Sequence, residues 1–204
     1  MTQRSRRPSA LIVVLGIDGA GKSTAVQGVE ELMPSTPVLV LGNYSGRKTI
    51  SALARRFGLP LPAQVADILE TVVRVYNVLL NHLRAGRFDG LVIMDRHLYC
   101  QLALRKARGI HRHRMLEALL EMLPKAQAIV YFDLTAEQAY ERIALRGEDQ
   151  ENLEDLQRFR MAYTDLPWFP RFVVIDAGGS TENSALQLQQ AIAGALESPS
   201  SCPQ

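Results

Sequence analysis

The stretch Gly16-Ile17-Asp18-Gly19-Ala20-Gly21-Lys22-Ser23-Thr24 decides the fold, because it fits the phosphate-binding pattern G-x-x-x-x-G-K-[ST]. An apolar, branched run at residues 10–15 precedes it, which is typical of a buried strand. After Lys22, apolar residues recur at helical spacing. A strand, a glycine loop and a helix are the context that this motif requires. The sequence therefore predicts a P-loop at the start of an α/β domain.

The residue types of this loop suit the phosphates of ATP. Glycines let the loop wrap tightly, so that backbone N–H groups form a nest for an anion, and the following helix N-terminus adds partial positive charge. Lys22 is placed to reach the β- and γ-phosphates, and Ser23 to ligate Mg²⁺. An ordinary glycine turn is the alternative, and the complete motif disfavours it. The predicted ATP-binding residues of the loop are Gly16, Gly19, Gly21, Lys22, Ser23 and Thr24.

Composition describes an ordinary globular chain of 204 residues with 47% apolar and 22% charged residues. A net charge of +2 gives no case for a nucleic-acid partner. The apolar runs have the length of strands, so no membrane span is expected. Cys100 and Cys202 lie far apart, which excludes a disulfide framework and suits a reducing cytoplasm. We predict a disordered basic arm over 1–9, one domain over 10–196 and a disordered tail over 197–204.

Strand patterns alternate with helical patterns along the whole domain, which predicts a parallel sheet with right-handed crossovers. Five strands with helices on their flanks are expected, and a ligand site at the carboxyl ends of the strands. The predicted strands are 10–15, 38–41, 91–95, 128–133 and 172–176. The helices with predicted bounds are 51–57, 63–85 and 153–166, and others are expected around 115–123, 135–146 and 185–196.

The predicted helix over 63–85 carries two stripes, each recurring at three and four residues. Glu70 and Arg74 lie four residues apart in the polar stripe. From the residues alone, a solvated ion pair is favoured there over a ligand-binding role. The apolar stripe consists of Val65, Ile68, Leu69, Val72, Tyr76, Leu79 and Leu83. The polar stripe consists of Asp67, Glu70, Arg74, Asn77 and Asn81.

Further candidate site residues follow later strands. Asp95 ends the third predicted strand and is followed by Arg96. In a P-loop protein this position suits Mg²⁺ or an attacking hydroxyl, and a helix cap or a buried ion pair with Arg96 is the alternative. Arg142 and Arg146 share one face of a helix that Thr135 begins with a capping box. A histidine-rich stretch at 111–114 has no metal partners at ligand spacing and predicts a solvated helix start.

Together these motifs resemble the thymidylate kinase family of nucleoside monophosphate kinases, over about residues 11 to 192. The resemblance implies ATP- and Mg²⁺-dependent phosphoryl transfer to a small nucleotide, dTMP to dTDP foremost, by a homodimer. The pieces that carry it are the P-loop, Arg74, Asp95-Arg96-His97, Tyr140-Glu141-Arg142-Ile143 with Arg146-Gly147, and Val174-Ile175-Asp176-Ala177.

The resemblance also implies a role for each matching residue. Asp18 contacts the acceptor's sugar hydroxyl, and Arg74 and Arg96 bind phosphate. Asp95 acts with Ser23 at the metal or orders its waters. Arg142 stacks on the adenine, and the loop at Ala177 borders it. Residues 147–152 form a lid that closes over the site and excludes water.

Two departures from the family pattern concern the acceptor. Where the family has Arg-Glu-Pro-Gly-Gly-Thr, this chain has Gly42-Asn43-Tyr44-Ser45-Gly46-Arg47. Arg47, displaced along the loop, is the predicted replacement for the missing acceptor-binding arginine. Cys100 stands for a serine, and Ala103-Leu104-Arg105 stands for the family's Ala-Tyr-Gln, which helps to recognise thymine.

The third departure concerns catalysis. Family members without an arginine in the P-loop carry one in the lid, whereas this chain has Gly19 in the P-loop and Asp149-Gln150 in the lid. Loss of such an arginine costs on the order of 10³ in rate. Arg146 is the predicted replacement, beside Lys22, Asp95 and Arg96 as catalytic residues.

Three functions therefore stand at this point. The first is a thymidylate-kinase-like enzyme. The second is a kinase of the same fold for a nucleoside, a modified nucleotide or another phosphorylated metabolite, which the altered acceptor residues motivate. The third is a P-loop nucleotide-binding switch with little catalysis, which the altered lid motivates.

Overall fold

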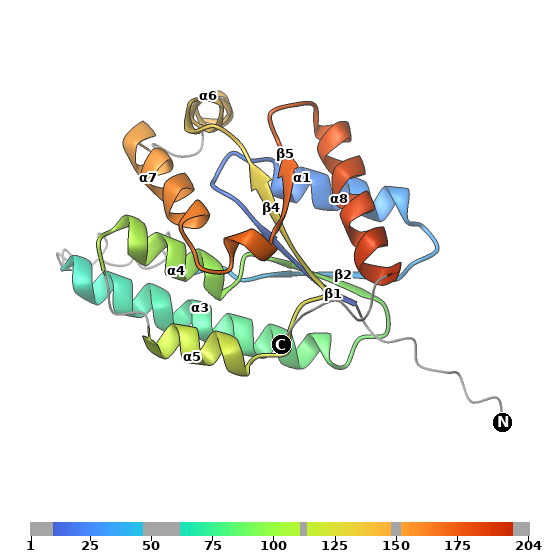
Figure 1. Ribbon diagram of the computed structural model, residues 1–204, viewed down its shortest axis with the longest axis horizontal. Coiled ribbons are helices and arrows are strands. Elements are labelled where there is room, and N and C mark those ends of the chain that lie inside the picture. Colours follow the sequence, from blue (N-terminus) through green and yellow to red (C-terminus); the bar gives the residue numbers. More distant parts are fainter. Residues whose placement is uncertain (1–9, 47–61, 111–113, 148–151, 198–204) are drawn as a thin grey trace.

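Five strands form the parallel sheet that the sequence predicts, and the branched residues of its three central strands are mostly buried. The structure is a computed structural model that describes residues 10–46, 62–110, 114–147 and 152–197. The strand order is β2-β3-β1-β4-β5, with β1 at the centre (Figure 1). The strands are β1 (Ala10–Leu15), β2 (Val38–Gly42), β3 (Leu91–Asp95), β4 (Ala128–Asp133) and β5 (Val173–Asp176).

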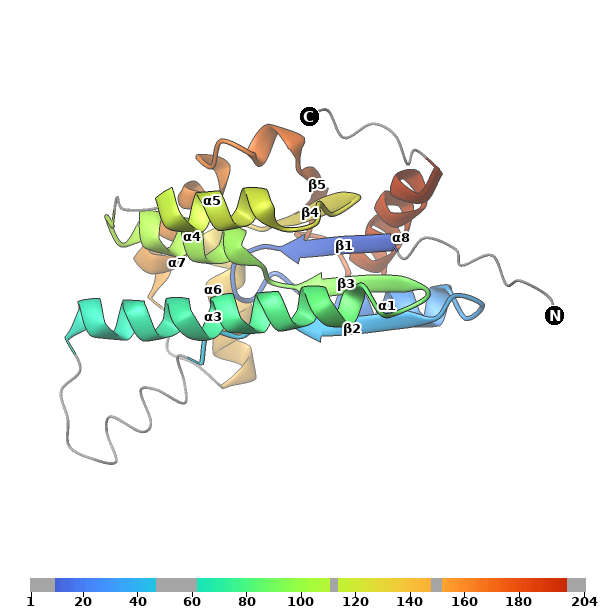
Figure 2. The same ribbon diagram turned by 90° about the horizontal axis from the view of Figure 1, so that it is seen from below.

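Helices cover both faces of this sheet. Helices α1 and α8 pack together on one face, and α3, α4 and α5 lie on the other, with α7 against α4 (Figures 1 and 2). None of the helices in the described part of the chain combines the length and apolar composition that a membrane-spanning segment needs. The helices are α1 (Lys22–Leu32), α3 (Ala63–Ala85), α4 (Leu98–Ala107), α5 (Arg114–Met122), α6 (Ala136–Arg146), α7 (Leu153–Thr164) and α8 (Thr181–Glu197), with a short 3-10 helix η1 (Phe169–Arg171).

The predicted element bounds agree closely with these, because local signals set them. Helix α6 begins as predicted, since the Thr135 side chain accepts a hydrogen bond from the Gln138 N–H. The helix is capped by Gly147, which has a left-handed backbone conformation. Glycine adopts this conformation without strain. Helix α4 is not among the predicted helices, and α7 is two residues shorter than its predicted range of 153–166. The predicted arm, helix over 51–57 and tail (197–204 except Glu197) lie outside the described residues.

Helix α3 has the predicted bounds, but its polar face points inward and its apolar face points outward. Asp67 and Glu70 are each 3% exposed and Arg74 is 4% exposed, whereas the seven residues of the apolar stripe are 40–64% exposed. The interpretation of Glu70 and Arg74 as a solvated ion pair is therefore wrong. The reason is tertiary packing, since the polar face of α3 meets α4 and the segment after β2.

Candidate functional site

The P-loop joins β1 to α1 in a conformation that only glycine adopts freely. Gly16, Gly19 and Gly21 have φ values of 144°, 82° and 79°. A Cβ atom on Gly16 would lie 2.9 Å from the carbonyl oxygen of Phe132, and one on Gly19 would lie 2.7 Å from that of Ala139. Helix α6 thus packs so closely on the loop that position 19 has no room for an arginine.

Lys22 is buried at the start of α1 and contacts backbone oxygens. Its Nζ donates to the carbonyl of Gly16 at 3.0 Å and to that of Ile17 at 2.7 Å. Burial lowers the pKa of Lys22, and the charge of Arg96 lowers it further, although Asp18 and Asp95 oppose this. Ser23 and Thr24 are exposed in the first turn of the helix. A phosphate group arriving here needs to displace only neutral carbonyls from the ammonium group.

Asp95 ends β3, and Arg96 follows it at the same edge of the sheet. Among the described residues, Arg96 is the one non-glycine residue with a positive φ, at 70°. Its guanidinium forms an ion pair with Asp18 of the P-loop. Burial lowers the pKa of Arg96, but the Asp18 carboxylate together with smaller contributions from Cys100, Tyr163 and Asp95 outweighs burial, so the net pKa is raised. The two segments of the chain that the motifs identified therefore meet directly.

A divalent cation fits beside these residues. The Oδ1 atom of Asp95 is buried and has no hydrogen-bond partner among the described residues. Carboxylate and hydroxyl oxygens are the ligands that Mg²⁺ prefers, together with water and substrate phosphates. The described part of the chain holds no cluster of three metal-ligating side chains. Asp95 and Ser23 would therefore hold the cation jointly with phosphate oxygens.

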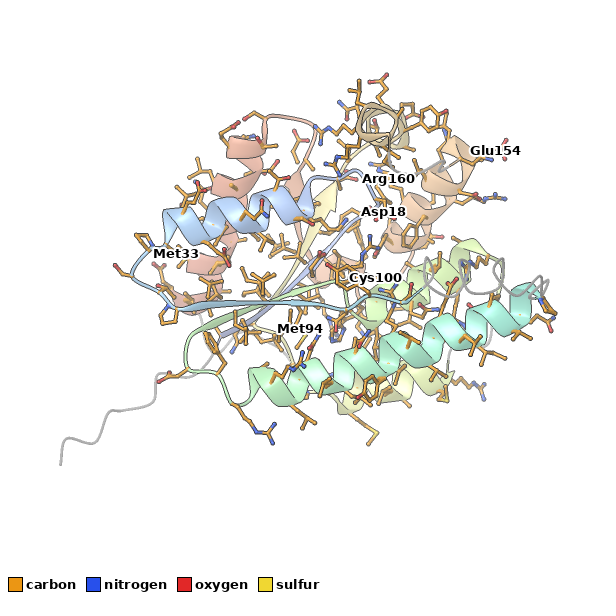
Figure 3. The ribbon with its side chains drawn as sticks, turned by 180° about the vertical axis from the view of Figure 1, so that it is seen from behind. Asp18, Met33, Met94, Cys100, Glu154 and Arg160 are labelled. Atoms are coloured by element: carbon orange, nitrogen blue, oxygen red, sulfur yellow. The ribbon has the colours of Figure 1, made fainter. Side chains whose placement is uncertain are left out.

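Arg74 of α3 lies on the other side of the site, buried and held by two neighbours. Its Nε donates to Oε1 of Gln101 at 3.0 Å, and its Nη1 donates to the carbonyl of Asn43 at 3.1 Å. Gln101 in turn donates to Oγ1 of Thr71 at 2.9 Å. Burial lowers the pKa of Arg74, and the nearby charge of Arg96 contributes. Figure 3 shows the side chains of this region, with Asp18 on the P-loop and Cys100 on α4 labelled.

A cluster of ion pairs lies between α3 and α4, toward the N-terminal end of α3. We call it the α3–α4 cluster, and it consists of Asp67, Glu70, Arg105 and Arg108. Asp67 forms ion pairs with Arg105 at 3.1 Å and with Arg108 at 3.4 Å. Arg108 also pairs with Glu70 at 3.1 Å. Arg105, one of the departures from the family pattern, is thus fixed by a carboxylate of α3 and lies 3.4 Å from Oγ1 of Thr71.

Arg142 of α6 borders the P-loop on the donor side. Its Nη2 donates to the carbonyls of Gly178 and Gly179 at 3.5 and 3.3 Å. Its Nη1 lies 3.9 Å from the position that a Cβ atom on Gly21 would take. Ala177, which precedes these glycines, is buried and donates its N–H to the carbonyl of Asp133. Arg142, the P-loop and the loop at Ala177 therefore lie close together.

Two predicted site residues remain without a described role. Arg146 is exposed at the end of α6, and Arg47 lies outside the described residues, as do residues 148–151 of the predicted lid. Sequence reasoning missed Gln101, which holds Arg74. The one pattern that could have pointed to Gln101 is the helical spacing of Leu98 and Leu102 on either side of it. That helix is not among those predicted from the sequence.

Comparisons with known proteins agree with this geometry. A family model for thymidylate kinase matches residues 14–188. A thymidylate kinase of Akkermansia muciniphila is 28% identical over 94% of this chain and 95% of its own length. A probable thymidylate kinase of Archaeoglobus fulgidus is 29% identical over 89% of this chain and 94% of its own length. A thymidylate kinase of Xanthomonas oryzae pv. oryzae is 25% identical over 96% of this chain and 88% of its own length.

Proposed function

Because the chain belongs to the thymidylate kinase family, we propose that it transfers the γ-phosphoryl group of ATP to a nucleoside monophosphate, with dTMP converted to dTDP as the leading reaction. The observation that carries this proposal is a pair of arginines beside a complete P-loop, the buried Arg74 and the partly buried Arg96. Two anionic substrates held side by side require such an excess of cations. A protein that bound ATP alone would not need Arg74.

In this proposal the chain mainly positions groups and neutralises charge, as phosphoryl transfer requires. Lys22 exchanges the carbonyls of Gly16 and Ile17 for the β- and γ-phosphates. Arg74 and Arg96 hold the acceptor phosphate, and Asp18 orients both Arg96 and a sugar hydroxyl of the acceptor. Mg²⁺, when bound by Ser23 and Asp95, neutralises charge on the phosphates.

The remaining proposed roles are on the donor side and in the lid. Arg142 stacks on the adenine, and the loop at Ala177 borders that ring, which their convergence on the P-loop supports. The packing of α6 on Gly19 requires the transition-state cation to come from outside the P-loop. Arg146 remains our candidate for it, and Arg47 our candidate for a further contact to the acceptor.

The test is an ADP-release assay of the full chain with ATP, Mg²⁺ and a panel of nucleoside monophosphates, with Lys22→Ala as the blank. We expect dTMP to stimulate ADP release above every other acceptor. A second candidate, a kinase of the same fold with another acceptor, is favoured by the Asp67–Arg105 ion pair where the family has a glutamine. Stimulation by another acceptor above dTMP would establish that candidate, and no stimulation by any acceptor would leave a nucleotide-binding switch.

We also propose that the enzyme is a cytoplasmic homodimer in which the outward face of α3 packs against the same face of a second copy. The apolar stripe of α3 supports this, because the domain itself leaves these residues 40–64% exposed. A two-fold axis brings equal surfaces together, so one helix face serves both subunits. The buried thiol of Cys100, which is free, is compatible with a reducing compartment.

The central residue of that face allows a sharp test of the dimer. Val72 is 59% exposed, and Val72→Asp places one charge from each copy at the contact. We expect light scattering after gel filtration to give a dimer for the wild type and a monomer for the variant. Glu197→Lys, far from α3 in the chain, serves as a charge-change control that leaves the mass unchanged. A wild-type monomer at micromolar concentration would contradict the proposal.

A further inference from the structure

We propose that Asn43 is a positioning residue that fixes both acceptor-side arginines, Arg74 and Arg96, in place for one phosphate group. The inference rests on the proposed function and adds a residue that the motifs left without a role. Asn43 directly follows β2 and is 0% exposed. A fully buried amide is costly unless its polar atoms are hydrogen-bonded, so each of its contacts is informative.

Asn43 connects β3 and α3 through its backbone and its side chain. Its N–H donates to the carbonyl of Asp95 at 2.9 Å. Its Nδ2 donates to the carbonyl of Arg96 at 2.5 Å. Its own carbonyl accepts the hydrogen bond from Nη1 of Arg74 at 3.1 Å. One residue thus contacts the metal-site strand end and both arginines.

The contact with Arg96 matters because of the backbone of that residue. A left-handed backbone conformation is strained for a non-glycine residue, and Arg96 has a φ of 70°. Its N–H is held by the carbonyl of Val14 at 3.1 Å and its carbonyl by Asn43. Both sides of Arg96 are therefore anchored in the conformation that directs the guanidinium to Asp18.

Asn81 of α3 determines which way the Asn43 amide points. Its Nδ2 donates to Oδ1 of Asn43 at 3.0 Å and to the carbonyl of Gly42 at 3.2 Å. Because Oδ1 of Asn43 is the acceptor there, its Nδ2 faces the carbonyl of Arg96. Oδ1 of Asn81 accepts from Arg84 at 3.3 Å, which fixes the orientation of Asn81 as well.

This arrangement requires an amide and not merely a side chain of that volume. Asn43→Asp is isosteric, but its carboxylate oxygen would face the carbonyl oxygen of Arg96 and donate nothing. We expect Arg96 to lose its backbone anchor directly. Arg74 keeps its acceptor, the backbone carbonyl of residue 43, and should be displaced only as repulsion between residue 43 and Arg96 shifts that carbonyl. Sites that hold Lys22 through Gly16 and Ile17 share no contact with Asn43 and should be unaffected.

The test measures steady-state kinetics of the full chain with the best acceptor of the panel. For Asn43→Asp we expect KM for the acceptor to rise about tenfold or more and kcat to fall, with KM for ATP within about twofold. Asn77→Ala is the matched control, because Asn77 lies on the same helix and donates to the neighbouring carbonyl of Tyr44 at 2.8 Å without touching an arginine. The double variant that combines Asn43→Asp with Arg74→Lys should have a kcat/KM for the acceptor only slightly below that of the less active single variant, because the two residues act together.

Two further measurements keep the inference separate from folding and from the proposed function. If Asn43→Asp fails to fold, Asn81→Ala replaces it, with the same pattern expected at about threefold in acceptor KM. Equal effects of Asn43→Asp and Asn77→Ala, or equal rises of both KM values, would overturn the inference while the wild type stays active. A wild type that is inactive with every acceptor would overturn the proposed function first.

Discussion

Lys22, in the P-loop half of the site, contacts backbone carbonyls, whereas the arginines of the α3–α4 half mostly contact side chains. Arg142, on the donor side, also contacts carbonyls, those of Gly178 and Gly179. On the acceptor side, Arg74 contacts Gln101, and Arg105 and Arg108 contact carboxylates of α3. Backbone carbonyls therefore hold Lys22 and Arg142, carboxylates hold Arg105 and Arg108, and Arg74 has one contact of each kind, a backbone carbonyl and a side chain.

This difference predicts that substitutions in the two halves of the site affect different properties, activity in one half and stability in the other. A cation held by carbonyls can be removed without leaving a buried charge behind. Removing one member of a buried ion pair leaves the other uncompensated, at a typical cost of about 3–5 kcal/mol. We therefore expect substitutions in the P-loop half to affect turnover alone, and those in the α3–α4 cluster to affect the free energy of unfolding first.

The largest effect is expected for Lys22→Met. Loss of the ammonium group removes the contact to the transferred phosphates, so kcat/KM should fall by about 10²–10³. The melting temperature should not fall, because burial disfavours the charged form of Lys22 and lowers its pKa. The ADP-release assay and thermal unfolding measure the two quantities. A lower melting temperature of Lys22→Met would contradict the expectation that substitutions in the P-loop affect turnover but not stability.

The second effect is expected for Asp67→Asn in the α3–α4 cluster. The substitution keeps the shape but removes the charge that faces Arg105 and Arg108. We expect the free energy of unfolding, measured in urea, to fall by about 2–3 kcal/mol. This loss is smaller than that for a fully buried ion pair, because Arg108 is partly exposed. Turnover should fall less than in Lys22→Met, since Asp67 contacts no proposed phosphate ligand in the described residues.

The exposed pair of Lys106 and Asp165, at 3.4 Å, provides the control for that experiment. Surface ion pairs contribute little, so Asp165→Asn should leave the unfolding curve nearly unchanged. If both variants behave alike, burial of the α3–α4 cluster does not determine its contribution. The comparison between the two halves would then rest on activity alone.

The same difference explains what the sequence could and could not predict. The P-loop is a contiguous motif that binds through its own backbone, so nine adjacent residues suffice to identify it. The acceptor half joins Asn43, α3 and α4, which are far apart in the chain. Helical periodicity gave the bounds of α3 but not its orientation, since an apolar stripe ordinarily faces the core. Here the inward face is polar because it meets Asn43, Gln101 and Arg105.

The smallest expected effect is a pH dependence confined to the acceptor half. Nε2 of His82 on α3 lies 3.0 Å from Nε2 of His97, the N-cap residue of α4. Burial lowers the pKa of His82 below its ordinary value of 6.5, so the folded state favours the neutral ring. The unfolded chain then binds more protons near and below that pH. The contribution to stability is therefore complete above about pH 6.5 and is lost as the pH falls below it.

Urea unfolding at about pH 7.5 and about pH 5.5 measures this directly, with His82→Gln as the variant that lacks the His82 ring. The wild type should lose more stability than His82→Gln over this interval, because burial lowers the pKa of both His82 and His97 in the wild type, whereas only His97 remains in the variant. Lys22→Met should show the wild-type difference, since the P-loop half holds no histidine among the described residues. An equal loss in the wild type and in His82→Gln would show that His82 does not contribute to the pH dependence.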